Sequence, residues 1–211
     1  MKEKIKELFK NKKLIFGVSL ILFVIITIIL LSGKINKIDE TIHSSILNIR
    51  NDNLTNIMII ITNICSIYAI VAISLLLLFL IKNKKIPIAI IANLICVTVI
   101  SQIFKFIIQR DRPIGINLIN ETGYSYPSGH SMVSMSFYGF IAYLLYKNLK
   151  SKLVKIILII LIFIGVFLIG FSRIYLGVHY FSDVIGGFLI GSVCLILAIN
   201  ITEKNFKEKL K

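Results

Sequence analysis

The sequence predicts an all-α, polytopic membrane protein: one domain, residues 1–211, built as a bundle of six transmembrane helices with a polar site at the outer membrane face. Three observations support this prediction. Apolar residues make up 57% of the chain, and charged residues make up 16%, against about 25% in a soluble domain. The apolar residues form runs long enough to cross a bilayer. The basic residues gather in the tails and loops on one side of these runs.

The apolar runs are read as spans because a transmembrane helix needs about 20 apolar residues. The first could instead be a signal peptide, but its apolar run of 18 residues exceeds the usual length of about 7–15. We expect the second to tilt or to project from the bilayer. The fourth is marginal and is expected to extend back to His130. The six segments are 14–31, 55–81, 86–104, 131–146, 153–171 and 183–200.

The basic residues predict the orientation. Of 24 Lys and Arg residues, 17 fall in the two tails and in the loops after the second and fourth spans. Because Lys and Arg are enriched on the cytoplasmic side, we expect a multi-pass protein of the cell membrane with both termini in the cytosol. The outer ends of spans three to six then carry the polar motifs. Topology therefore explains the net charge of +14, and no nucleic-acid partner is expected.

Two sets of small residues inside the spans are interpreted as structural. The scattered cysteines give no disulfide framework and no zinc spacing, so we expect them to be small buried residues. A small-xxx-small pair in the sixth span would let that helix pack closely on a neighbour. These residues are Cys65, Cys96 and Cys194, and Gly187 and Gly191.

The first polar cluster is KFIIQRDRP. On a helix, Lys105 and Arg112 are two turns apart and share a face, and Pro113 marks the helix end. Two interpretations stay open: two cations that converge on an anion, or a Lys and an Arg that only extend to the membrane interface. Arg110 and Asp111 are interpreted as solvated or mutually paired.

The second cluster is YPSGH, which ends at His130. Pro127 and Gly129 predict a turn before a helix, whose first backbone N–H groups favour an anion. Ser128 adds a hydroxyl, Gly129 lets a ligand approach the backbone, and His130 can donate a proton near neutral pH. The alternative is an ordinary turn in which Ser128 caps the helix.

The third cluster is SRIYLGVHYFSD. His179 and Asp183 are four residues apart and would be neighbours on a helix. A carboxylate beside an imidazole fixes its tautomer and orientation. Arg173 adds a guanidinium. The alternative is an ion pair that only anchors the start of a span.

Together, the clusters place three cations and two histidines at one membrane face. The third histidine of the chain, His43, lies in a polar outer loop and is expected to be solvated. Two His and one Asp could bind zinc, but three nearby cations oppose a dication. Cations, turn N–H groups and two His suit a phosphate instead, so no metal is expected.

The three clusters resemble the signature of the type 2 phosphatidic acid phosphatase (PAP2) superfamily. That signature is K-x6-R-P, then P-S-G-H, then S-R-x5-H-x3-D, and every fixed letter is present in order between Lys105 and Asp183. The six-span layout agrees with the membrane branch of this family.

The resemblance implies a role for each residue. His179 would attack phosphorus and form a phosphohistidine, Asp183 would orient His179, and His130 would protonate the leaving oxygen. No cofactor is implied. The phosphoryl oxygens would be held by Lys105, Arg112, Ser128, Gly129 and Arg173.

The resemblance also implies a lipid phosphate as substrate, within the outer leaflet and among membrane lipids. A short six-span chain is most similar to bacterial undecaprenyl diphosphate phosphatases, which act in cell wall synthesis. Phosphatidylglycerophosphate or phosphatidate is the alternative substrate. A halide-oxidising activity like that of soluble relatives does not suit a membrane setting. A non-enzymatic anion or lipid transporter is the alternative of a different class. The sequence does not indicate the oligomeric state.

Overall fold

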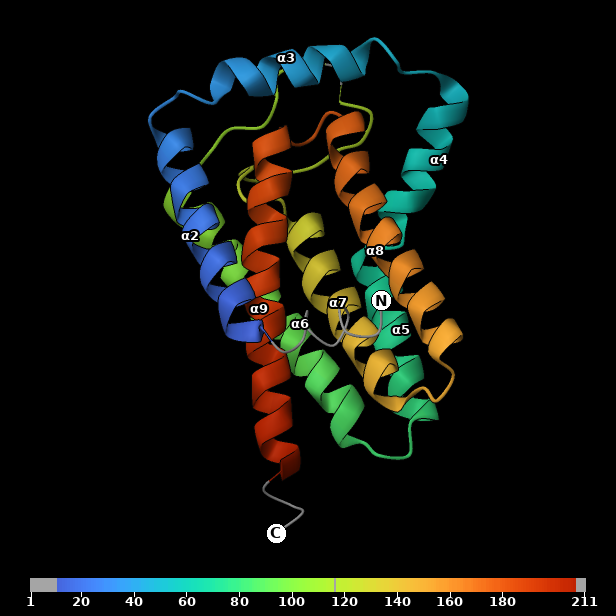
Figure 1. Cartoon of the computed structure of the whole chain (residues 1–211). Helices are drawn as coiled ribbons and strands as arrows, with labels where there is room; N and C mark the ends of the chain where they lie inside the picture. Colours follow the sequence, from blue (N-terminus) through green and yellow to red (C-terminus); the bar gives the residue numbers. More distant parts are fainter. Residues whose placement is uncertain (1–10, 116, 208–211) are drawn as a thin grey trace.

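The chain folds as an all-α bundle in this computed structural model, which describes residues 11–115 and 117–207 (Figure 1). The described residues form eight helices and no strand, which confirms the all-α part of the expected fold class. The helices are α2 (Lys12–Leu31), α3 (Asn36–Leu47), α4 (Asp52–Asn63), α5 (Ile67–Leu80), α6 (Lys85–Ile108), α7 (Gly129–Asn148), α8 (Lys152–Tyr175) and α9 (Phe181–Lys207).

Within the described part of the chain, four helices are long and apolar enough to cross a membrane: α2, α6, α8 and α9. The pair α4 and α5, bent by 44°, makes a fifth candidate. The sequence predicted one continuous span over 55–81, but Ser66 interrupts it by accepting a hydrogen bond from the Ala69 N–H and starting α5. Helix α7 covers the fourth expected span but is not among the candidates. The chain is thus a multi-pass helical membrane protein with four or five apolar span candidates, where six were predicted.

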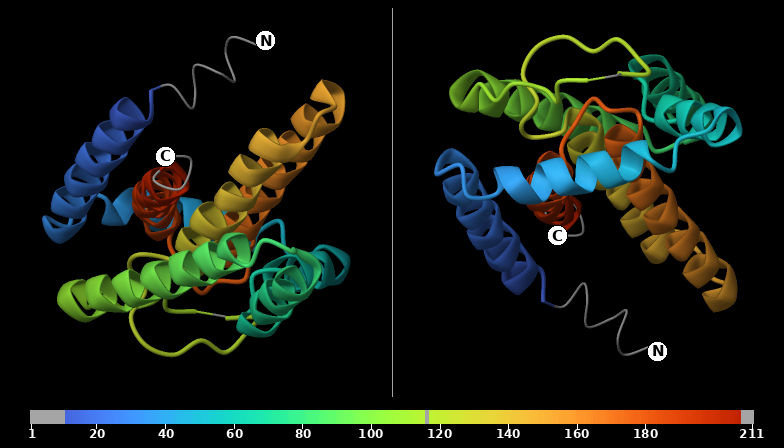
Figure 2. Two further views of the ribbon diagram at one scale, coloured as in Figure 1. Left: turned by 90° about the horizontal axis from the view of Figure 1, so that it is seen from below. Right: turned by 90° about the horizontal axis from the view of Figure 1, so that it is seen from above.

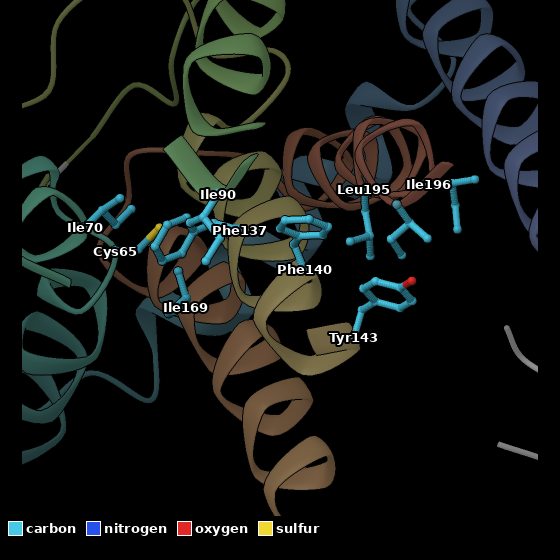
Figure 3. Packing of buried hydrophobic residues seen from close by; sticks show 10 residues of the cluster. Cys65, Ile70, Ile90, Phe137, Phe140, Tyr143, Ile169, Leu195 and Ile196 are labelled. Carbon is cyan, nitrogen blue, oxygen red and sulfur yellow. The ribbon is translucent and has the colours of Figure 1, made fainter. Parts of the chain in front are cut away.

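Helix α7 lies inside the bundle, where it packs against α6, α8 and α9. Its Phe137 and Phe140 are fully buried. They lie in one apolar cluster with Ile90 of α6, Ile169 of α8 and Leu195 of α9 (Figure 3). Many weak dispersion contacts of this kind add up to a rigid support. The core therefore fixes the helix whose first residues belong to the second polar cluster.

Helix α3 lies across one end of the bundle, not along it (Figures 1 and 2). It packs on α8 and α9 through a face that includes Asp39, His43 and Ile46. The expectation that His43 is solvated is wrong: it is buried, with its ring 6.1 Å from the ring of Tyr180. The reason is that this polar segment forms a helix laid on the bundle and not an open loop.

The start of α2 and the end of α9 meet at the opposite end of the bundle. Lys12 Nζ lies 2.5 Å from Oε2 of Glu203, and the Tyr143 hydroxyl donates to Oε1 of the same carboxylate at 2.8 Å. These contacts join the two terminal helices. Some of the basic residues that the sequence analysis counted in the two tails lie outside the described residues. These are Lys2, Lys4, Lys6, Lys10, Lys209 and Lys211.

Helices α9 and α7 approach closely at the expected pair of glycines. A Cβ added at Gly187 would lie 2.7 Å from the Ser128 carbonyl oxygen, and one at Gly191 would lie 2.6 Å from that of Met132. Both distances are too short for a real contact, so only glycine fits. The predicted small-residue contact is confirmed, and it holds the first half of α9 against the start of α7.

The cysteines are free thiols. Cys65 and Cys194 are buried, as expected, whereas Cys96 is exposed. For Cys96 the expectation is wrong because it lies on the side of α6 that lines an apolar crevice between α6 and α9.

Gly191→Ala is expected to lower the melting temperature of the detergent-solubilised protein. The added methyl group would meet backbone atoms, which cannot move aside as the end of a side chain can, and such overpacking costs about 1–3 kcal/mol. Gly165→Ala in α8 is the matched control, since a Cβ there has nothing within 4 Å. Equal melting temperatures for the two variants would contradict the close packing of α9 on α7.

Candidate active site

All three polar clusters meet at the end of the bundle that α3 covers, which we call the motif end (Figure 1). Lys105 lies in the last turn of α6 and Arg173 in the last turn of α8. Asp183 lies in the first turn of α9, and Gly129 begins α7. Helix ends therefore position the site, and the loop of residues 109–128 links α6 to α7 across it.

His179 lies between α8 and α9, and its side chain is buried. Its Nδ1 is 3.5 Å from Oδ2 of Asp183 and 3.2 Å from Oγ of Ser125. A carboxylate at Nδ1 favours the proton on that nitrogen and leaves the lone pair on Nε2. Burial lowers the pKa of His179 to about 4, although Asp183 acts in the opposite direction, so the ring is neutral at neutral pH. The sequence placed the pair on one helix, but α9 begins only at Phe181.

Asp183 is fully buried, and its carboxylate is held on both oxygens. Oδ2 accepts hydrogen bonds from the Ser125 hydroxyl and, at 2.8 Å, from the Tyr180 N–H. Oδ1 lies 2.6 Å from the Arg110 guanidinium. Because these contacts leave the carboxylate little freedom, it can hold the ring of His179 in one orientation.

Arg110 links this carboxylate to α3. We expected Arg110 to be solvated or paired with Asp111, and this is wrong: its guanidinium also lies 2.7 Å from Oδ2 of Asp39. Burial acts to lower the pKa of Arg110, but Asp183 and Asp39 outweigh it and raise that pKa. Asp39 is fully buried and also accepts from the backbone N–H and hydroxyl of Ser182, at 2.9 and 2.5 Å.

Arg112 reaches the site from the loop and not from a helix. The sequence placed it on one helical face with Lys105, but α6 ends at Ile108, where Gln109 adopts a left-handed backbone conformation with φ of 50°. The chain turns there, because a left-handed residue ends the helical hydrogen-bond pattern. The two cations nevertheless lie close enough to interact electrostatically.

The guanidinium of Arg112 lies beside the ring of His179, on the side opposite Asp183. One of its nitrogens lies 3.3 Å from Nε2. Burial lowers the pKa of Arg112, although Glu121 and Asp183 act against this. Other N–H groups of Arg112 donate hydrogen bonds of 2.8–3.0 Å to three backbone carbonyl oxygens, those of Thr122, Gly123 and Val178.

Arg173 is buried at the end of α8, with 1% of its surface exposed. It donates to Oγ1 of Thr62 at 2.7 Å and forms an ion pair with Glu121. Its Nε has no hydrogen-bond partner among the described residues. Glu121 also lies 3.7 Å from Arg112, so one carboxylate faces both guanidinium groups.

Lys105 and His130 belong to the same cluster of charges. Lys105 interacts electrostatically with Arg112 and Arg173, and His130 interacts with Lys105, His179 and both arginines. The structure therefore brings together the side chains that the sequence motifs contribute. His130 lies in the first turn of α7, and its carbonyl oxygen is 3.5 Å from the Cys65 thiol.

Ser128 does not play the ordinary capping role that the sequence left open. It is the N-cap residue of α7, but its side chain makes no capping hydrogen bond and accepts from Oγ of Ser131 at 3.1 Å. Its backbone N–H donates to the Asp183 carbonyl oxygen at 3.0 Å, which joins the turn to α9. Gly129 follows, and the Oγ of Ser101 lies 3.5 Å from where its Cβ would be.

The donor set fits an oxyanion. Guanidinium and ammonium groups, hydroxyls and the start of a helix all supply hydrogen-bond donors or positive potential. Nε2 of His179, which carries a lone pair, lies beside the guanidinium of Arg112. Three cations at such close range would oppose a dication. The arrangement can therefore hold a phosphoryl group against a neutral imidazole.

Sequence reasoning missed part of the site. Arg110 carried a signal, since it lies within the first cluster, and Glu121 is an acidic residue in the loop between two motifs. The others had no local signal, because only the fold brings them to the motif end. The missed residues are Asp39, Thr62, Arg110, Glu121 and Ser125.

Comparison with known proteins gives a consistent result. The family model of the PAP2 superfamily matches residues 86–207, which contain all three clusters. Phosphatidylglycerophosphatase B of Bacillus subtilis is 36% identical over 114 residues, which are 53% of each chain, so the match spans about half of that relative. Undecaprenyl-diphosphatase of Sulfolobus acidocaldarius is 27% identical over 166 residues, 75% of each chain.

Two solved structures share the fold. The crystal structure of a transmembrane PAP2 type phosphatidylglycerolphosphate phosphatase from Bacillus subtilis has a TM-score of 0.82 at 29% identity, covering 90% of this chain and 96% of that one. The crystal structure of Aquifex aeolicus LpxE has a TM-score of 0.62 at 27% identity, covering 77% and 95%.

Asp39→Asn is expected to destabilise the protein. Removing one partner of a buried ion pair costs about 3–5 kcal/mol, because the charge left behind is buried without compensation. The measurement is the melting temperature in detergent. Asp52→Asn, at an exposed acid in the first turn of α4, is the control and should change stability by less than about 0.5 kcal/mol. A shift no larger for Asp39→Asn than for the control would show that Arg110 does not depend on Asp39.

Proposed function

This chain belongs to the PAP2 superfamily, and from that premise we propose that residues 1–211 form a single phosphatase domain that hydrolyses a lipid phosphate or diphosphate. The observation that carries the proposal is the neutral His179, whose Nδ1 faces a buried carboxylate and whose Nε2 lies beside Arg112. The two curated relatives, by their names, also act on lipid phosphates.

In the proposed first step, Nε2 of His179 attacks phosphorus while the bond from phosphorus to the leaving oxygen breaks. His130 gives its proton to that oxygen, and a phosphohistidine forms. Asp183 stabilises the positive charge that develops on the ring. In the second step, a water oxygen attacks phosphorus while the bond from phosphorus to Nε2 of His179 breaks, His130 takes a proton from the water, and inorganic phosphate leaves. No metal or other cofactor takes part in either step.

The negative charge of the transition state is spread over the phosphoryl oxygens. We assign its stabilisation to Lys105, Arg112 and Arg173, together with the Ser128 hydroxyl and the Gly129 N–H. Arg173 Nε, which has no partner among the described residues, is a donor that a phosphoryl oxygen can use. Donors fixed in advance in a partly buried site cost little reorganisation during the reaction.

We place the site on the outer side of the cell membrane. The motif end lies opposite the end where Lys12 meets Glu203. Two connections, from α5 to α6 and from α7 to α8, reach that same end (Figure 1). With the adjoining helix turns they carry Lys82, Lys84, Lys85, Lys147, Lys150, Lys152 and Lys155, and basic loops favour the cytoplasmic side. Both termini would then be cytosolic, and the phosphate group would enter from the outer leaflet.

For the lipid tail we propose an apolar cavity of about 320 Å³ beside α7. Its lining includes Ile64, Tyr138 and Leu161. Ile64 adjoins Cys65, whose thiol contacts the His130 carbonyl, so this cavity lies close to the proposed general acid. A tail there would leave the phosphate among the cations.

The substrate that we propose first is undecaprenyl diphosphate, cleaved to undecaprenyl phosphate for reuse in cell wall synthesis. Phosphatidylglycerophosphate and phosphatidate are the alternatives, and the relatives named above support the first two of these three lipids. For a transporter we find no favouring observation: Asn93, a polar residue within a span, pairs with Ser136.

The proposal is tested by phosphate release from purified protein in detergent with EDTA, with the three lipids offered in parallel. We expect EDTA to leave the rate unchanged. We expect His179→Ala to lower it by about 10³-fold or more, because the nucleophile is lost. His130→Ala should lower it by about 10²–10⁴-fold, because the leaving group is then not protonated.

His43→Ala is the matched control, since His43 is also buried at the motif end but lies against Tyr180 and outside the cation cluster. It should release phosphate much faster than the His179 variant. Release by His179→Ala at the control rate would rule out the phosphohistidine. Loss of activity in EDTA would rule out the metal-independent reaction, and the fastest lipid identifies the substrate.

A further inference from the structure

We propose that Glu121 is a specificity-determining residue: its carboxylate competes with ligands for Arg112 and Arg173 and so excludes singly charged lipid phosphodiesters from the site. This inference rests on the proposed function, since it concerns which phosphate groups reach the same cations. It assigns a purpose to an acidic side chain that lies within ion-pair distance of two of the proposed phosphate-binding residues.

The geometry places Glu121 where a phosphate would bind. Its Oε1 forms an ion pair with Arg173, and its Oε2 lies 3.7 Å from Arg112. Two oxygens that bridge two guanidinium groups imitate two oxygens of a phosphoryl group. Electrostatic interaction also links Glu121 to His179 and Lys105. The carboxylate therefore lies within the same field of positive charge.

The backbone near Glu121 is held at this position. Arg112 donates to the carbonyl oxygens of Thr122 and Gly123, the two residues that follow, at 3.0 Å each. The side chain of Glu121 is 28% exposed, so it can swing toward water when a ligand takes its place. A fixed backbone and a partly exposed side chain together make a tethered and displaceable anion.

Glu121 carries its charge at neutral pH. Burial acts to raise its pKa, but Arg173 and Arg112 outweigh burial and lower it. A ligand that binds Arg173 through the nitrogen facing Glu121 must therefore displace a charged group. Thr62 accepts from its second terminal nitrogen, so within the described residues only Nε of Arg173 has no partner, and a ligand that binds both terminal nitrogens and Arg112 must displace Glu121.

Because a ligand must displace the Glu121 carboxylate, ligands with a larger negative charge are favoured. A phosphodiester headgroup carries one negative charge, as the carboxylate does, and the tethered carboxylate acts at a high effective concentration. Such a headgroup therefore gains little by replacing Glu121. A terminal phosphate carries about −1.5 to −2 at neutral pH, so its attraction to the cations is larger. This matters in a membrane, where phosphodiester lipids surround the site in large excess over the substrate.

The test compares two lipids with the same tails: dioctanoyl phosphatidate, with a terminal phosphate, and dioctanoyl phosphatidylglycerol, a phosphodiester. Phosphatidylglycerol is added as an inhibitor of phosphate release from phosphatidate in mixed micelles. We expect its inhibition constant to fall by about tenfold or more in Glu121→Gln relative to wild type, because the competing charge is gone. Glu121→Asp keeps the charge and should retain most of the wild-type discrimination.

Glu40→Gln is the matched control. It removes the same charge from an exposed position of α3 at the same end of the protein. Its inhibition constant should stay at the wild-type value. An equal fall in both variants would mean a general electrostatic effect and would overturn the proposal, as would an unchanged constant in Glu121→Gln. Glu121→Ala provides a second neutral variant if Glu121→Gln does not fold.

A second readout does not depend on turnover. The rise in melting temperature on adding each lipid is measured for wild type and Glu121→Gln. We expect phosphatidylglycerol to stabilise the variant and not the wild type, whereas phosphatidate stabilises both. If no phosphate is released but this pattern appears, the proposed function fails and the role of Glu121 stands. If phosphate is released and the two proteins respond alike to phosphatidylglycerol, Glu121 is not the filter.

Discussion

The arrangement of the motif end depends on one buried carboxylate, Asp183. It is fully buried, yet it contacts several residues outside α9, among them His179 and three residues of the loop 109–128. Of these three, Arg110 and Ser125 bind the carboxylate, and the Ser128 N–H donates to the Asp183 carbonyl oxygen. A buried carboxylate is costly unless hydrogen bonds and opposite charge compensate it. The need to compensate Asp183 therefore draws these segments to the first turn of α9.

Arg110, which compensates the charge of Asp183, also links that residue to α3. Its second ion pair, with Asp39, brings α3 onto the bundle, and Asp39 in turn binds Ser182 beside Asp183. The result is a closed set of contacts, Asp183 to Arg110 to Asp39 to Ser182, across three separate segments. This explains why α3 lies across the bundle. The motif end needs a carboxylate there to balance Arg110, and a helix provides one from a buried position.

The same charge argument governs the cations. Lys105, Arg112 and Arg173 interact with one another unfavourably, and Arg173 is almost completely buried. Glu121 and the backbone carbonyls around Arg112 reduce this repulsion. A site prepared for an anion is thus stable only with an internal anion nearby. In our proposal that structural requirement also gives the site its preference for doubly charged phosphate.

The sequence predicted the motifs well because each is local. The histidines, the turn at Gly129 and the order of the clusters can be read from spacing, and helix ends then bring them together. Arg110 and His43 were misjudged, since their partners Asp39 and Tyr180 lie far away in the chain. The prediction that Lys105 and Arg112 share a helical face was wrong because the helix ends before Gln109. Glutamine is not a residue type that signals a left-handed helix end.

The position of α7 explains the difference in span count. Hydropathy identifies helices that face lipid, but α7 faces protein on most sides and can bury Ser131, Ser134 and Ser136. A helix that supports the Ser128–Gly129 turn from the inside of a bundle has no need of a lipid-compatible surface. The position of α7 inside the bundle therefore accounts for its polar residues, and it also places His130 near the cations.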